Sequence, residues 1–205
     1  MIKKNINPIG KRREKQKVET YDLILKSARY LFKIKGFEKT TIRGVAAHAE
    51  IASGTIYKHF QGKTALLAAA FYDDLERLFS KAQNTIPKND ALRDQFLHLI
   101  RYNLYFYTSN PKLSREYLLH IPFAGKEWID QIDEFEKLYL ETVEELVRSA
   151  QQRGEIDKKK DGHFVAISLM ANYFYVLSDL FLKQKVNDMD QIISFLKEIN
   201  DQVLC

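Results

Sequence analysis

Residues 41–60 read TIRGVAAHAEIASGTIYKHF, and Lys63 follows shortly after them. The stretch divides into two short helical patterns around a break, and the second pattern begins with the small residues Ser53, Gly54 and Thr55. Two short helices joined by a tight turn are typical of a helix-turn-helix, in which the second helix lies in the DNA major groove. The stretch therefore predicts a DNA-binding head.

The charge of the chain is unevenly distributed along its length. Residues 1–64 contain 15 Lys and Arg against 5 Asp and Glu, a net charge of +10, whereas residues 65–205 contain 17 against 22, a net charge of −5. Because a basic segment attracts phosphates, we expect only the first part to meet DNA. We divide the chain into a basic N-terminal arm (1–19), a helix-turn-helix domain (20–64) and a ligand-binding and dimerisation body (65–205).

Helical periodicity dominates the whole chain. There are only 8 Gly and 4 Pro, and no run alternates between apolar and polar residues as a half-buried strand does. The pattern predicts an all-α fold of nine helices, at about 20–35, 42–49, 53–60, 63–82, 90–106, 111–120, 128–153, 163–184 and 189–204. We expect Thr41, Ser53 and Asp90 to cap the helices that follow them, and Gly36 and Gly154 to close the helices before them.

Several classes of protein do not fit this sequence. The single cysteine, Cys205, allows no internal disulfide, which is typical of a reducing compartment and favours a cytoplasmic protein. The N-terminus carries a basic arm where a secretory signal would have an apolar core. Residues 164–182 include 15 apolar residues of 19, but Ser168, Asn172, Ser178 and Asp179 interrupt them, so we expect a helix covered by protein and no membrane partner.

The sequence also lacks the motifs of an enzyme. It has no Gly-rich phosphate loop and no Gly-x-Ser-x-Gly, and its five histidines stand at no metal-ligand spacing with a second His or Cys. The carboxylates of residues 134–145 are explained by a solvated helix face. We therefore expect no catalytic residue, no metal and no cofactor.

A set of spacings across the head matches a known pattern. The matching pieces are Ile24-Leu25, Ala28, Leu31-Phe32, Gly36-Phe37, Thr40-Thr41, Val45-Ala46, Ser53-Gly54-Thr55-Ile56-Tyr57, His59-Phe60, Lys63 and Leu66. In these residues the chain resembles the TetR family of bacterial one-component regulators, closely over about residues 20–70. The family usually has a glycine where this chain has Glu50, and a left-handed backbone at Glu50 costs about 1 kcal/mol.

The resemblance implies which residues meet DNA. Thr41 and Arg43 begin the second helix, and Lys63 meets a phosphate at the start of the fourth. The recognition helix contributes Ser53, Gly54, Thr55, Tyr57, Lys58 and His59. Several of these residues also have a possible role without DNA contact. Thr41 and Ser53 would cap helices, and Tyr57 would be a half-buried brace. Arg43 and Lys58 would be solvated charges, and His59 a capped or core histidine. The arm either follows the DNA or forms a solvated tail, and we favour the tail.

Aromatic residues are concentrated in the body. Residues 96–139 contain ten Phe, Trp or Tyr, about twice the density expected from the chain average of 12%. Tyrosines supply both the apolar walls and the polar groups of a small-molecule site, although aromatic residues at helical spacing are also common in cores. Our candidate ligand-binding residues are Asn103, Tyr107, Tyr117, His120, Phe123, Trp128, Tyr139 and Tyr173.

The last two predicted helices are more apolar than one chain can cover. The stripe in residues 189–204 consists of Ile192, Ile193, Phe195, Leu196, Ile199 and Val203. Paired with the same helices of a second copy, they would form a four-helix interface and present two recognition helices to a palindromic operator.

We therefore expect a homodimeric transcriptional regulator, a repressor released from DNA by a small, largely apolar effector. The alternatives are an effector-independent architectural DNA-binding protein that works through a protein partner, and a small-molecule-binding enzyme. Which operator and effector it uses, and whether the effector releases or promotes DNA binding, the residues leave open. The resemblance further implies that the fourth helix couples body to head by a pendulum-like movement.

Overall fold

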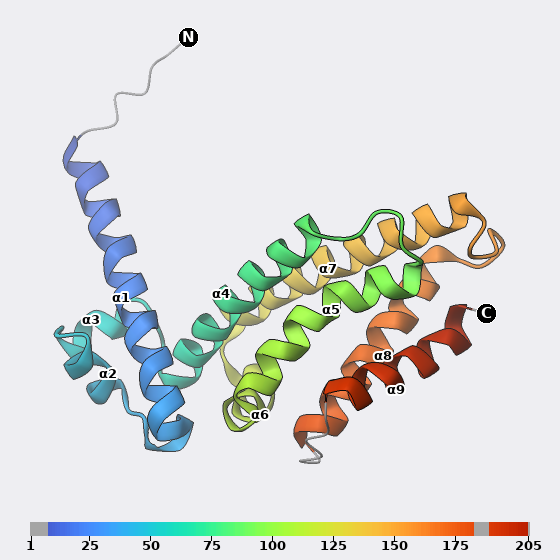
Figure 1. The fold of residues 1–205 in the computed structure, drawn as a ribbon. Coiled ribbons are helices and arrows are strands. Elements are labelled where there is room, and N and C mark those ends of the chain that lie inside the picture. The colour runs from blue at the N-terminus through green and yellow to red at the C-terminus, as the bar shows by residue number, and fades with distance from the viewer. Residues whose placement is uncertain (1–7, 183–188, 205) are drawn as a thin grey trace, which may run out of the picture.

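The computed structural model describes residues 8–182 and 189–204, and every regular element in these ranges is helical (Figure 1). The elements are α1 (Pro8–Lys39), α2 (Ile42–His48), α3 (Ser53–Tyr57), α4 (Lys63–Asn84), α5 (Leu92–Ser109), α6 (Pro111–His120), the 3₁₀ turn η1 (Ile121–Phe123), α7 (Lys126–Arg153), α8 (Gly162–Leu182) and α9 (Met189–Leu204). For the described residues, the predicted all-α fold of nine α-helices is confirmed. None of these helices is both long and apolar enough to cross a membrane, α8 included.

The first three helices form a small head around a shared core. Ile24 and Phe32 of α1, Val45 of α2 and Ile56 of α3 are almost completely buried, together with Phe60 just after α3. In Figure 1 the start of α1 extends away from the rest of the molecule, and α2 and α3 lie beside its middle and lower part. The head therefore exposes α2 and α3 at one end of the molecule.

The helices α4–α9 form the body, and α4 leads into it from the head (Figure 1). The buried aromatic and branched side chains of α4, α5, α7 and α8, including Phe79, Phe96, Val143 and Leu169, make its core. The last two helices, α8 and α9, pack side by side at the edge of the body away from α2 and α3. This arrangement leaves α8 and α9 accessible on their outer side.

Three predicted helix ends are confirmed. Gly154 ends α7 with a φ of 77°, and Gly36 ends the main part of α1 at a kink with a φ of 79°; glycine adopts both conformations without strain. The Thr41 hydroxyl accepts a hydrogen bond of 3.0 Å from the Gly44 amide and caps α2. A Cβ at residue 44 would lie only 3.2 Å from that hydroxyl, which explains why glycine fits there.

Other predicted helix ends were wrong. The first helix begins at Pro8 rather than near Thr20, so residues 8–19, predicted as part of a solvated tail, continue α1. The cap of α3 is Ala52 rather than Ser53, and α3 ends at Tyr57 instead of residue 60. The cap of α5 is Ala91 rather than Asp90, and the Glu155 carboxylate from the loop before α8 accepts a 2.6 Å hydrogen bond from the Leu92 amide. The part of the arm at residues 1–7 lies outside the described residues.

Candidate nucleic-acid interface and ligand cavity

The turn between α2 and α3 sets the geometry of the head. Glu50 has a φ of 54°, and it is the one non-glycine residue with positive φ in the described part of the chain. The turn is closed by backbone hydrogen bonds from the Ile51 amide to the Ala46 carbonyl (3.0 Å) and from the Glu50 amide to the Ala47 carbonyl (3.3 Å). A side chain in this conformation is strained, so the turn is held by the packing of α2 against α3.

Most of the predicted DNA-binding residues are accessible in this head. Thr41, Arg43, Gly54 and Lys58 are exposed, and Ser53 and Thr55 are half-buried. Nothing lies within 4 Å of the position of a Cβ on Gly54, so the backbone of α3 is open to a partner there. Tyr57 is 61% exposed, which excludes the half-buried brace that we had kept as its alternative.

His59 and Lys63 are turned toward the protein instead. The His59 ring lies 6.0 Å from the Tyr21 ring, and partial burial, then the positive charges of Lys17 and Lys58, lower its pKa below the ordinary value of histidine. The Lys63 ammonium donates to the carbonyls of Phe37 (2.9 Å) and Glu38 (3.4 Å), at the end of α1. Lys63 therefore ties α4 to α1 in the free protein, and its phosphate contact stays a prediction.

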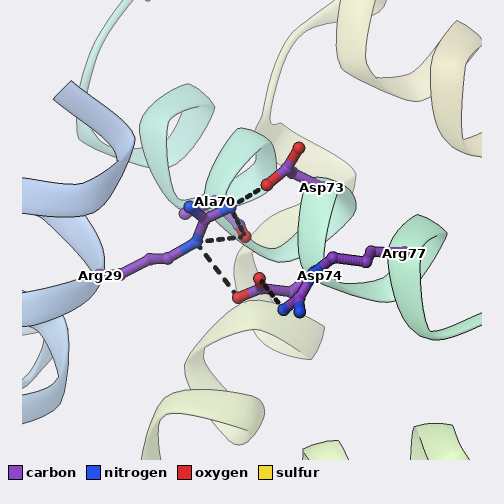
Figure 2. A network of polar contacts seen from close by, with 5 residues as sticks. All are labelled: Arg29, Ala70, Asp73, Asp74 and Arg77. Carbon is purple, nitrogen blue, oxygen red and sulfur yellow. Dashed lines mark hydrogen bonds and ion pairs between the residues drawn. The ribbon is translucent and has the colours of Figure 1, made fainter. Parts of the chain in front are cut away.

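A polar network joins the head to α4 (Figure 2). The Arg29 guanidinium, from α1, donates to the Ala70 carbonyl at 3.3 Å and forms ion pairs with Asp73 and, at 3.2 Å, with Asp74. Asp74 also pairs with Arg77 at 3.1 Å, so both of its oxygens are used. Ala70, Asp73 and Asp74 lie on one face of α4, so a shift of α4 along its axis would break their contacts with Arg29.

Three of the predicted ligand residues lie at or near this joint rather than in a pocket. The His120 ring packs 4.7 Å from the Phe37 ring of α1, and Trp128 stacks at 6.4 Å on Phe60 of the head. Phe123 is 79% exposed on η1. His120 and Trp128 therefore hold the head against the body, a role that their aromatic character alone did not distinguish from ligand binding.

The other five candidates surround one cavity inside the body. It has a volume of about 110 Å³ and lies between α4, α5, α6, η1, α7 and α8. The five are Asn103, Tyr107, Tyr117, Tyr139 and Tyr173. Burial raises the pKa of all four tyrosines, so each hydroxyl is uncharged at neutral pH.

The same cavity contains polar atoms without partners. Asn103 and Tyr139 are 3% and 2% exposed, and the Asn103 Oδ1 and the Tyr139 hydroxyl form no hydrogen bond with any described residue. Buried polar atoms in proteins are nearly always paired, because leaving one unpaired costs free energy. These two atoms mark the cavity as a place where a bound molecule would supply the missing donors.

Two features of this region were not expected from the sequence. Glu136 lines the cavity, and we had placed the carboxylates of this helix on a solvated face; its spacing of three residues from Tyr139 was the available signal. The ligand atoms of Glu38, Glu116 and His120 lie within 4.8 Å of one another where α1 meets α6, a cluster that no sequence spacing reveals.

Comparison with known proteins agrees with this geometry. Residues 24–70, which run from the middle of α1 into α4, match the profile described as bacterial regulatory proteins of the tetR family. The similarity to the tetR family is therefore carried by the N-terminal part of the chain. The matched residues include α2, α3 and the Arg29 contact to Ala70, so the similarity covers the head and its contact with α4.

Two longer matches extend the similarity into the body. The chain is 22% identical over 147 residues to the fatty acid metabolism regulator protein of Bacillus subtilis (strain 168), covering 72% of this chain and 76% of the relative. It is 24% identical over 163 residues to the HTH-type transcriptional regulator UidR of Escherichia coli (strain K12), covering 77% and 79%. The fold matches that of the transcriptional regulator FadR from Bacillus subtilis in complex with stearoyl-CoA, with a TM-score of 0.70 at 17% identity over 90% of this chain and 97% of that one.

Proposed function

We propose that this protein is a homodimeric repressor that leaves a palindromic operator when a small, largely apolar effector enters the cavity of the body. The observation that carries the proposal is the position of α4. Its first half holds the Arg29 contacts to the head, and its Tyr72 and Leu75 line the cavity. One helix therefore connects the expected DNA surface with the expected effector site.

The proposed mechanism is a shift between two conformers. A ligand that fills the cavity presses on Tyr72 and Leu75, and α4 moves relative to α1, which changes the spacing of the two heads in the dimer. The ligand changes DNA affinity only as far as its affinity for the two conformers differs. Phe71 supports this route, because its ring stacks 4.4 Å from the ring of Tyr117, a cavity residue, while its neighbour Ala70 contacts Arg29.

Exposed aromatic side chains on α8 and α9 support the dimer. Phe164 and Tyr175 of α8 are 66% and 54% exposed, and Phe195 of α9 lies 6.4 Å from Tyr175 and is also exposed. Ile192, Ile193 and Leu196, which we had counted toward the interface stripe, are instead buried within the chain. We therefore assign the proposed interface to Phe164, Tyr175 and Phe195. Tyr175 and Phe195 are neighbours on α8 and α9, and exposed rings that lie together are typical of a surface that another protein covers.

The proposed effector is either small enough for the cavity or widens the cavity when it binds. A cavity of about 110 Å³ is somewhat smaller than one of roughly 150 Å³ known to hold benzene. A long acyl chain, such as that of the stearoyl-CoA bound to the Bacillus subtilis FadR, would have to widen it. Widening by a ligand is consistent with the proposed displacement of α4.

The test of this proposal is selection of DNA from the source genome. Purified protein is mixed with sheared genomic DNA at physiological salt, and the bound fraction is sequenced. We expect one palindromic sequence beside a few genes, with half-sites about 10 base pairs apart, centre to centre, or a multiple of that. Diffuse recovery along the chromosome would contradict a local repressor and favour the architectural alternative.

A further inference from the structure

The lining of the cavity in the body has a negative net charge. Of the described residues that line it, only Glu136 carries a formal charge at neutral pH, and none is a lysine, arginine or histidine. Partial burial and the neighbouring Asp133 raise the pKa of Glu136, which means that a nearby positive charge would relieve an unfavourable carboxylate. Burial is the main cause of the raised pKa of Tyr107 and Tyr117, and the negative charge of Glu136 adds to it.

The polar groups of the cavity form one cluster. The Tyr107 and Tyr117 rings lie 6.5 Å apart, and Tyr139 and Tyr173 line the same cavity. A side-chain hydrogen bond joins Asn103 to Tyr173 and opposes the rise of the tyrosine's pKa. The Asn103 Oδ1, an acceptor, and the Tyr139 hydroxyl remain without partners. The cluster therefore offers a bound molecule acceptor oxygens, aromatic faces and one carboxylate.

The cavity shares part of its lining with a surface groove between α7 and α8. Glu136, Met170 and Phe174 line both the cavity and a surface groove between these two helices. The groove also contains Asp133 and Lys137, and Lys137 lies 4.0 Å from Glu141. A molecule in this groove would meet the carboxylate of Glu136 and the apolar side chains of Met170 and Phe174.

We propose that the effector of this protein is a largely apolar molecule that carries a protonated amine. The ammonium group binds among the tyrosines, donates to Asn103 Oδ1 and the Tyr139 hydroxyl, and is balanced by Glu136. The apolar part lies against Met170 and Phe174. The inference rests on the proposed function and narrows its effector to one chemical class.

An ammonium group fits these residues for three physical reasons. It has three donors and no acceptor, so it matches a cluster that has unpaired acceptors. Aromatic faces attract a desolvated cation. An anionic head group would instead meet the carboxylate of Glu136 with no basic side chain lining the cavity to balance it. This chemistry differs from that of the CoA thioesters bound by the FadR proteins of Bacillus subtilis and Thermus thermophilus.

The experiment compares three probes with one shared body, namely 4-phenylbutylamine, 4-phenylbutanol and 4-phenylbutyrate. Each is titrated into the full-length protein by calorimetry at pH 7.5, with lauroyl-CoA as a fourth probe. We expect the amine to bind at least about tenfold more tightly than the alcohol, because it gains charge-assisted hydrogen bonds, and the carboxylate to bind more weakly than both.

Variants separate this inference from a general loss of structure. Glu136→Gln is expected to reduce amine affinity to about that of the alcohol and to leave alcohol binding unchanged. Tyr139→Phe should weaken the amine while the melting temperature stays level or rises, since it removes an unpaired buried hydroxyl. Glu134→Gln is the matched control, because Glu134 is on the same helix but lines neither the cavity nor the groove.

The inference is overturned if the carboxylate or lauroyl-CoA binds as tightly as the amine, if the amine does not bind, or if Glu136→Gln leaves amine affinity unchanged. The affinity of selected operator DNA is measured separately, with and without the amine. Tight amine binding without any change in DNA affinity would support the ligand class and contradict the proposed coupling.

Discussion

Glu50 occupies a backbone conformation that a residue with a side chain rarely adopts, at φ 54° in the turn between α2 and α3. The side chain itself is exposed, so its packing does not offset the strain. The strain belongs to the backbone, and the contacts of the flanking helices maintain it. The residue therefore reduces the stability of the head without changing its shape.

Replacing Glu50 by Gly is expected to raise the free energy of unfolding by about 1 kcal/mol, because glycine adopts positive φ without a steric penalty. Urea denaturation followed by circular dichroism measures the change. Glu50→Ala is the control, since alanine keeps the Cβ and should give no such gain. Equal stability of the Gly and Ala variants would show that the turn is unstrained.

Tyr57 presents its ring to solvent from the end of α3. If it meets the operator, Tyr57→Ala should weaken DNA binding by about 1–3 kcal/mol, the range for one specific contact, and change the free energy of unfolding by less than about 0.5 kcal/mol. Fluorescence anisotropy with the selected operator measures the affinity. Tyr105→Ala alters an equally exposed tyrosine of the body and should leave DNA affinity unchanged. Unchanged operator affinity in Tyr57→Ala would remove this residue from the interface.

At the scale of elements, the contact between α1 and α4 connects the two parts of the chain. Arg29 is the centre of this contact, with two carboxylates and one backbone carbonyl as partners (Figure 2). Lys63 adds a second connection by donating to carbonyls at the end of α1. These contacts make α4 the element through which ligand binding would reach the head.

Arg29→Ala is expected to lower the free energy of unfolding by about 2 kcal/mol, because it leaves Asp73, Asp74 and the Ala70 carbonyl without this partner. It should also reduce the factor by which effector changes DNA affinity, while the variant still binds effector. The coupling free energy, obtained from DNA titrations with and without effector, measures this. Arg77→Ala removes an exposed partner of Asp74 alone and should change both quantities little. Full coupling in Arg29→Ala would exclude this route.

The helix ends show how much of the fold could be predicted from the sequence. Helix ends set by local chemistry, such as Thr41, Gly36 and Gly154, followed from the residue types. The cap on Leu92 did not, because the carboxylate that provides it belongs to Glu155, 63 residues later. His120 and Trp128 could not be separated from the cavity tyrosines, since aromatic residues serve equally well in a domain joint and in a pocket.

Binding to a palindromic operator requires two copies of the chain. A double substitution of Phe164 and Phe195 by Glu should yield a monomer in analytical ultracentrifugation, because each places a charge in the proposed apolar interface. The monomer is expected to bind the operator far more weakly, since it presents one recognition helix instead of two. Phe123→Glu is the control, because it adds the same charge at an exposed ring on η1. A double variant that stays dimeric would contradict this interface.

The proposal that effector changes the spacing of the two heads can be tested by measuring the distance between them. Spin labels at Ala47→Cys, an exposed position of α2, in a Cys205→Ser background report this distance by pulsed electron paramagnetic resonance. With operator DNA we expect one narrow distance, fixed by recognition helices about 34 Å apart. Effector without DNA should move the population to a different distance. If no interspin distance is detected, the protein is not the proposed dimer. If the distance is the same with DNA and with effector, the proposed movement of the heads is wrong.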